Sequence, residues 1–240
     1  MRSPISILIC GIGGQGVKLL SHVTAQAAAR NHPHVCHTES RGLSQRGGSV
    51  FSEVRFGAKP LAPMLGAHRV DFVLALDALE ALRAATNLNG SGLLIANSQY
   101  EVPLHLKVQW SKSAAQLAGQ AALNDWVRDA LETQQKAQLA DLPRLALRAG
   151  SPKVMNAILL GLASVHLPIA KEDFRDALAE FLAPDWREIN LRGFEIGRQV
   201  AHTHAAQWAP PAPPGIPLLL CMSSRRGSDR TNAVPKSRNS

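Results

Sequence analysis

The sequence predicts an α/β protein with a doubly wound, mostly parallel sheet, helices on both faces and a β-hairpin-like insertion after the second strand. Three observations support this prediction. An apolar run at residues 6–10 ends in a glycine loop and continues into a helical pattern. A strand-like run at residues 34–39 leads through a polar glycine loop to an alternating segment at residues 50–57. From residue 70 onward, apolar strands alternate with helical patterns, which is typical of a parallel sheet.

The first unit carries the most specific local motif. Its strand, Ser6 to Cys10, stops at the sequence GIGGQG of residues 11–16, and a helix is expected from Val17 to Ala29. The motif fits GxGxxG between a strand and a helix, where missing side chains let the backbone approach a phosphate and the helix N-terminus offers free N–H groups. The alternative is a tight turn without a ligand. The candidate cofactor-binding residues here are Gly11, Gly13, Gly14, Gln15 and Gly16.

The second predicted strand ends in an acidic residue. Glu39 follows Gly16 by 23 residues, near the place where a dinucleotide-binding fold puts its ribose-binding carboxylate. A stand-alone NAD(P)-binding Rossmann-type reductase is therefore an alternative. The polar loop at residues 40–49 argues against it, because a Rossmann unit would place a helix close to here. The chain also lacks a recognisable catalytic Tyr/Lys pair, since its only tyrosine is Tyr100.

The rest of the body returns to alternating strands and helices, in a Rossmann-like rhythm. In chain order we expect a strand at 70–76, a helix at 78–86, a turn at 89–92, a strand at 93–97, an apolar helix at 154–163, an amphipathic helix at 171–182 and a last helix including 190–198. Residues 98–150 are harder to interpret. There, 106–110 has the composition of a strand and 114–139 is rich in helix-forming residues.

Length and composition favour one core domain. The chain has 240 residues, of which 45% are hydrophobic, enough for one sizeable core. The N-terminal apolar run is too short to span a bilayer and lacks the cleavage site of a signal peptide, so a cytoplasmic protein is expected. Three cysteines without a CxxC pair assemble neither a disulfide framework nor a zinc or iron–sulfur site. Cys10 and Cys36 are interpreted as small apolar side chains without a catalytic role.

The positive charge is concentrated at the C-terminal end. The net charge is +8, and the last forty residues hold five basic residues against one acidic residue, which is half of the excess. Without an aromatic and basic stripe in the body, nucleic-acid binding is not expected. We expect a domain at residues 1–200 and a disordered Pro/Ser/Arg-rich tail at 201–240. A binding module recruited through this basic tail remains a further alternative.

Several segments together resemble one family. The chain is similar to the gamma-type domain of 2-oxoacid:ferredoxin oxidoreductases, and within them most to the beta subunits of indolepyruvate ferredoxin oxidoreductases. The resemblance covers about residues 4–200 in matching order, and the tail has no counterpart in it. It rests on GIGGQGVKLL at 11–20, ESRGLSQRGGSVFSEVRFG at 39–57, DFVLALDALEALR at 71–83, KVMNAILLGLAS at 153–164, LPI at 167–169 and INLRGFEIGR at 189–198.

The resemblance implies the chemistry. In this family a 2-oxoacid is decarboxylated on thiamine diphosphate, two electrons leave singly through iron–sulfur clusters to ferredoxin, and coenzyme A accepts the acyl group. Thiamine diphosphate, magnesium and 4Fe-4S clusters would then belong to a large partner subunit. This chain would bind no cofactor alone, would carry no catalytic residue, and would form one wall of a site for coenzyme A or a thiamine phosphate. Neither a nucleic acid nor a membrane is expected as a partner.

Two further groups of residues complete the candidate site. Arg46, flanked by glycines, is suited to a phosphate or a partner carboxylate, and the alternative is a solvated loop arginine. Asn156 lies in an otherwise apolar helix, where an unpaired amide would cost roughly 1–3 kcal/mol, so we expect a hydrogen bond to a neighbouring loop or a ligand. Glu39 is expected to anchor the loop after it, and the alternative is a role in proton transfer. None of the nine histidines is assigned a metal, because no two share a metal-ligand spacing in a predicted element. The candidate loop residues are Ser44, Gln45, Arg46, Gly47 and Gly48.

Overall fold

One six-stranded sheet forms the centre of the protein. The computed structural model describes residues 4–41, 48–59, 70–101, 129 and 136–205. The strand order is β2-β3-β1-β4-β5-β6. β3 runs antiparallel to β1 and β2, whereas β1, β4, β5 and β6 are parallel neighbours, which confirms the predicted mostly parallel sheet. The strands are β1 (Ile5–Ile12), β2 (His34–Arg41), β3 (Ser49–Gly57), β4 (Val70–Ala75), β5 (Leu88–Asn97) and β6 (Ala137–Ala140).

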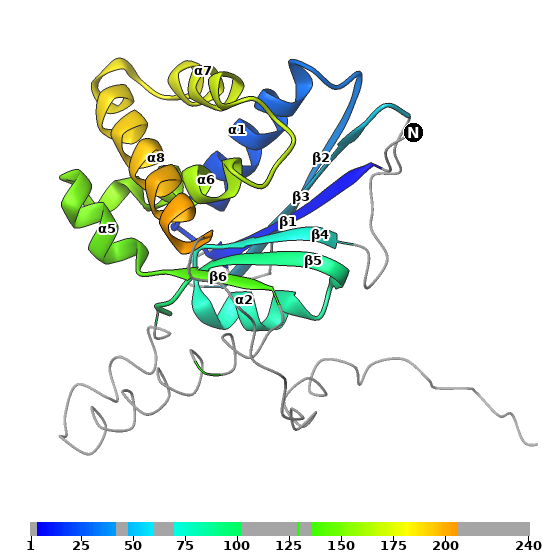
Figure 1. Cartoon of the computed structure of the whole chain (residues 1–240), viewed down its shortest axis with the longest axis horizontal. Helices are drawn as coiled ribbons and strands as arrows, with labels where there is room; N and C mark the ends of the chain where they lie inside the picture. The colour runs from blue at the N-terminus through cyan, green and yellow to red at the C-terminus, as the bar shows by residue number, and fades with distance from the viewer. Residues whose placement is uncertain (1–3, 42–47, 60–69, 102–128, 130–135, 206–240) are drawn as a thin grey trace, which may run out of the picture.

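Helices cover both faces of this sheet (Figure 1). α2 lies against one face, and the other described helices lie on the opposite side. Within β1, Ile7 and Ile9 join the apolar cluster that includes α1, α6 and α8, whereas Leu8 and Cys10 join the cluster with α2. The alternation of side chains in a strand therefore supplies both cores. The helices are α1 (Val17–Ala29), α2 (Ala78–Ala85), α5 (Leu142–Ala149), α6 (Met155–Ser164), α7 (Lys171–Phe181) and α8 (Pro184–Ala205), with a short 3₁₀ helix, η1 (Pro152–Val154), directly before α6.

The predicted hairpin-like insertion is present as the pair β2–β3. Arg41 pairs with Val50 and His34 with Gly57, so the two strands run antiparallel along their full length. β3 also pairs with β1, with Ile12 opposite Ser49. The hairpin therefore replaces the helix that a dinucleotide-binding unit would have after its second strand, and it leaves β2 at the edge of the sheet.

Two local predictions are wrong. Residues 89–92, interpreted as a turn, lie inside β5, where the register against β4 shifts between Val70 and Phe72. The glycines of this stretch mark the irregularity rather than the end of an element. The helix-forming run 114–139 also ends differently, because 137–139 belong to β6, which pairs with β5 from Leu94 onward. Of the rest of that run, only Asp129, which is helical, and Lys136, which lies in a turn, are described, and the possible strand at 106–110 lies outside the described residues.

α6 and α8 cross at very short range. A Cβ atom placed on Gly161 would lie 2.1 Å from the carbonyl oxygen of Phe194, and one on Gly197 would lie 2.1 Å from that of Ile158. Each helix backbone therefore contacts the other where glycine stands. Phe194 is fully buried beside this crossing.

α8 is one continuous helix of 22 residues that extends to Ala205. The predicted domain boundary at residue 200 stays a prediction.

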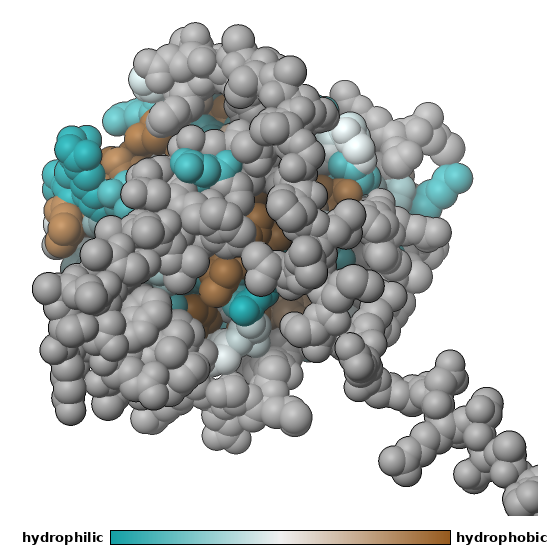
Figure 2. Space-filling view, turned by 90° about the horizontal axis from the view of Figure 1, so that it is seen from below, coloured by the Kyte–Doolittle hydropathy of each residue, from teal (hydrophilic) through white to brown (hydrophobic). Residues whose placement is uncertain are grey.

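On the face drawn in Figure 2, the described residues that are visible include both apolar and polar ones. No helix in the described part of the chain combines the length and the apolar composition needed to cross a membrane.

Candidate functional site

The carboxyl ends of the parallel strands gather polar residues. β1 leads into the glycine loop, β4 into Asp77, β5 ends at Asn97 and β6 is followed by Asp141. In open α/β sheets this edge is where ligands bind, because loops and helix N-termini converge there. The edge is therefore the candidate functional site.

The glycine loop forms a tight turn that Gln15 fills. The Gln15 backbone N–H donates to the Ile12 carbonyl at 3.0 Å, and the Gln15 side-chain oxygen accepts from the Ile12 N–H at 2.9 Å. The same oxygen would lie 2.8 Å from a Cβ on Gly11. Gly14 and Gly16 have φ angles of 103° and 91°, which other residues adopt only with strain. Gln15 thus has a structural role, and Gly14 leaves open space above the turn.

The glycine loop is fastened to the start of β3. The Gly13 N–H donates to the Gly48 carbonyl at 2.9 Å. Since Arg41 pairs with Val50, both flanks of residues 42–47 lie at the same edge as the glycine loop. Ser44, Gln45, Arg46 and Gly47 themselves lie outside the described residues, so their proposed contacts stay predictions.

Asn156 approaches the glycine loop from α6. Its Nδ2 would lie 2.2 Å from a Cβ on Gly16, so the amide occupies the space that any larger residue at position 16 would fill. The residue is only 9% exposed. The hydrogen bond that we expect from Asn156 to a neighbouring loop is not found among the described residues. The structure therefore brings two candidate residues, distant in sequence, into direct contact at the site.

The N-terminus of α1 suits an anion. Gly16 provides no side-chain cap, and the first turn of α1 has no acidic residue. By contrast, α2 and α5 are capped by Asp77 and Asp141, whose side chains accept backbone N–H groups. The free N–H groups and the positive end of the helix dipole of α1 thus face the edge of the sheet, where the Asn156 amide adds a donor.

Two buried polar residues that the sequence analysis did not single out shape this edge. Asn97 donates to the Leu76 carbonyl at 3.1 Å and accepts from the Leu142 N–H at 3.2 Å, which ties β5 to the ends of β4 and β6. Asp77 accepts from Leu79, Glu80 and Glu101 N–H groups. Burial raises the pKa of Asp77 despite these bonds. Their signal in the sequence is a polar residue just after an apolar strand.

The other residues considered from the sequence, Cys10 and Glu39, are held by burial or by contacts within the fold. Burial raises the pKa of the Cys10 thiol far above its usual range, in keeping with the expected inert role. Glu39 contacts His22 of α1, with 2.9 Å between Oε1 and Nε2, so it ties β2 to that helix. At the sheet edge, Asp77 is occupied by backbone donors. The described edge therefore offers an anion the N-terminus of α1 and the Asn156 amide, beside the Glu101 carboxylate, which accepts from Gln15 Nε2 at 3.5 Å.

The chain is similar in sequence to known proteins. The family described as pyruvate ferredoxin/flavodoxin oxidoreductase matches residues 6–200. The indolepyruvate oxidoreductase subunit IorB of Thermococcus kodakarensis is 29% identical over 199 residues, which cover 82% of this chain and 95% of the relative.

Solved structures share the fold at lower identity. The gamma subunit of a keto/oxoacid ferredoxin oxidoreductase from Geobacter sulfurreducens has a TM-score of 0.59 and 19% identity, covering 83% of this chain and 99% of that one. The 2-oxoglutarate:ferredoxin oxidoreductase of Magnetococcus marinus, solved with 2-oxoglutarate, coenzyme A and succinyl-CoA, has a TM-score of 0.63 and 14% identity. The match covers 89% of this chain and 33% of that longer polypeptide.

Proposed function

Because the chain belongs to the pyruvate ferredoxin/flavodoxin oxidoreductase family, we propose that it is the small subunit of a 2-oxoacid:ferredoxin oxidoreductase acting on indolepyruvate or another arylpyruvate. The relative from Thermococcus kodakarensis supports the substrate class by its name and by its match over almost its full length. The reaction is oxidative decarboxylation: the 2-oxoacid loses carbon dioxide, coenzyme A receives the acyl group, and two electrons pass to two ferredoxin molecules.

The large partner subunit holds the redox cofactors in this proposal. When bound there, thiamine diphosphate with magnesium provides the electron sink for decarboxylation and 4Fe-4S clusters carry the electrons. The three cysteines of this chain have no cluster-like spacing, which agrees with that division of labour. The small subunit is then inactive alone.

The role of this chain is to bind a phosphate group, which we assign to coenzyme A, at the edge formed by the glycine loop. The observation that carries this assignment is the juxtaposition of the uncapped α1 N-terminus at Gly16 with the Asn156 amide. Gly14 leaves room for close approach of a ligand to the backbone. The 42–47 segment, whose flanks lie at this edge, would supply Arg46 as a further cation.

The test is a charge substitution in the assembled complex. Asn156→Asp places a carboxylate beside Gly16, where it would repel a phosphate and also exchange a donor for an acceptor. We expect the KM for coenzyme A to rise about tenfold, with a smaller change in the KM for arylpyruvate, in viologen-reduction assays under anaerobic conditions. Gln199→Glu on the exposed face of α8 adds the same charge elsewhere and is expected to leave both constants unchanged.

Two results would contradict this proposal in different ways. An unchanged KM for coenzyme A in Asn156→Asp would show that the phosphate does not bind at this edge. The assignment of the chain as a small subunit would not be affected. A chain that purifies from its native cells without an iron-bearing partner, and that binds NADH tightly, would favour the stand-alone reductase. The antiparallel β3 that follows β2 disfavours that alternative.

A further inference from the structure

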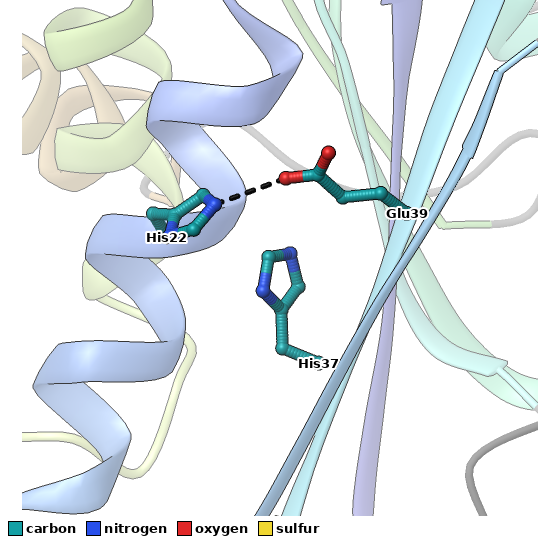
Figure 3. A group of neighbouring side chains, drawn as sticks. All are labelled: His22, His37 and Glu39. Atoms are coloured by element: carbon teal, nitrogen blue, oxygen red, sulfur yellow. Dashed lines mark hydrogen bonds and ion pairs between the residues drawn. The ribbon is translucent and has the colours of Figure 1, made fainter.

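A second cluster of polar side chains lies between α1 and β2, apart from the glycine loop. It consists of His22 on α1 and His37 and Glu39 on β2 (Figure 3). One possible ligand atom from each residue lies within 4.8 Å of the others. In Figure 3 the His37 ring rises from β2 toward the His22–Glu39 pair. From this convergence we propose that His22, His37 and Glu39 form a binding site for a divalent transition-metal ion of the Zn²⁺ class.

The ligand types and their spacing fit such an ion. Two imidazoles and one carboxylate are a common three-residue set for zinc, with water completing a tetrahedron. Bonds of about 2.1 Å at tetrahedral angles place ligand atoms roughly 3.4 Å apart. The His22 Nε2 and Glu39 Oε1 atoms are 2.9 Å apart, and the side chains are 39% and 25% exposed. A small outward shift of these accessible side chains is therefore sufficient to admit the ion.

Neighbouring groups already orient the two imidazoles. The Ser21 hydroxyl lies 3.0 Å from His37 Nε2, and the His22 and His37 rings meet edge to face at 4.7 Å. Phe181 lies 5.8 Å from the His22 ring between centroids. Such outer contacts are the usual means by which ligating histidines are held in place. These contacts hold the two rings in place without any change in the backbone of α1 or β2.

The positive charge of Lys18 opposes a bound cation at this cluster, so its removal tests the proposal. Lys18 lies one turn before His22 on α1, is exposed, and, after burial and His22, contributes to lowering the pKa of His37. Removing that charge should favour a bound cation. A metal at this site would cross-link α1 to β2, the edge strand of the sheet. This role is independent of the reaction proposed above.

The experiment uses the untagged full chain after treatment with a chelator. Zn²⁺ affinity is measured by competition with a chromophoric chelator, and Co²⁺ absorption reports the coordination geometry. His22→Gln, His37→Gln and Glu39→Gln should each weaken Zn²⁺ binding by about tenfold or more and abolish a four-coordinate Co²⁺ spectrum. Lys18→Gln should strengthen binding by a few-fold. His202→Gln, an exposed histidine on α8, is the matched control and should bind as the unsubstituted chain does.

Thermal unfolding provides a second readout that does not depend on activity. Zn²⁺ should raise the Tm of the unsubstituted chain and of His202→Gln, but not of the three ligand variants, because an ion bound only to the folded state stabilises it. The proposal is overturned if the unsubstituted chain does not bind Zn²⁺. It is also overturned if all three ligand variants fold, as judged by circular dichroism, and bind with unchanged affinity, since the metal would then occupy other histidines.

Discussion

Individual polar residues fix the shape of the sheet edge. Asn97 and Asp77 are almost fully buried and satisfy backbone groups of neighbouring turns, as buried polar groups must. Asn156 differs, because its amide faces Gly16 without a hydrogen bond to a described residue. Among the described residues, the Asn156 amide is not one of the buried side-chain groups without a partner, so its polar atoms reach the surface at Gly16, where a ligand can contact them.

His166 is expected to make stability depend on pH. Its Nε2 atom lies 2.9 Å from Gln138 Oε1, and desolvation of the ring, followed by the charge of His202, lowers its pKa below the usual 6.5. Between these two pKa values the unfolded chain binds more protons than the folded one. The stabilising contribution is therefore complete above pH 6.5 and is lost as the pH falls from there toward the folded-state pKa.

Thermal unfolding at pH 7.5 and pH 5.5 measures this effect. The Tm of His166→Gln should fall less between pH 7.5 and pH 5.5 than the Tm of the unsubstituted chain. The control is His34→Gln on β2, which is at the opposite end of the sheet from the Gln138 strand, β6, and should keep the original pH dependence. Equal losses in the His166 variant and the unsubstituted chain would show that another group titrates.

At the scale of whole elements, the crossing of α6 and α8 depends on glycine. Glycine normally weakens a helix relative to alanine. At Gly161 and Gly197, however, an added methyl group would meet a carbonyl oxygen of the other helix at 2.1 Å. The close backbone approach brings Phe194 and the apolar face of α6 into one core, and this core supports the N-terminal turn of α6 that carries Asn156.

Alanine substitutions at this crossing should therefore destabilise the protein. Gly161→Ala and Gly197→Ala are each expected to lower the free energy of unfolding by about 1–3 kcal/mol, because the helices must separate. Gly193→Ala should have a smaller effect, since its nearest neighbours are side-chain atoms of Val154 at 3.3 Å. Gly90→Ala in β5 is the control, with open space around the added methyl. Urea unfolding gives the four values, and an equal loss in the control would refute the role of the crossing.

At the scale of the whole molecule, the inserted hairpin separates this fold from a dinucleotide-binding one. β3 enters between β1 and β2, so the second parallel strand is moved to the edge of the sheet. The glycine loop is thereby joined to the start of β3 by the hydrogen bond from the Gly13 N–H to the Gly48 carbonyl. The same edge of the sheet thus holds the uncapped N-terminus of α1, Asn156, and Arg41 and Gly48, the two residues that flank residues 42–47.

The C-terminal tail is expected to be dispensable for this arrangement. A chain ending at Ala205 keeps all of α8 and removes a segment that carries five basic residues and one acidic residue. We expect its Tm to be unchanged and its assembly with the large subunit to be retained in an anaerobic pull-down. Loss of assembly with an unchanged Tm would instead show that the basic tail recruits the partner.

Local patterns in the sequence were enough to predict most of the elements near the site. The helix 17–29 follows the glycine loop as predicted, and the strands around residues 5–12, 34–41 and 49–57 are confirmed within a few residues. These segments have strong periodicity and clear turn residues. The α5 helix and β6 were not recognised. β6 has only four residues, AQLA, whose helical preference is overridden by pairing with β5.

The sequence by itself determined the α/β class, the glycine loop and the family resemblance, because each depends on residues close together in the chain or on motifs in order. Only the tertiary structure decided which distant residues meet. It placed Asn156 against Gly16, packed α6 on α8 through glycine, and brought His22 to His37 and Glu39. No spacing of histidines predicts that last cluster, since its members come from a helix and a strand whose relative position is set by packing of the whole sheet.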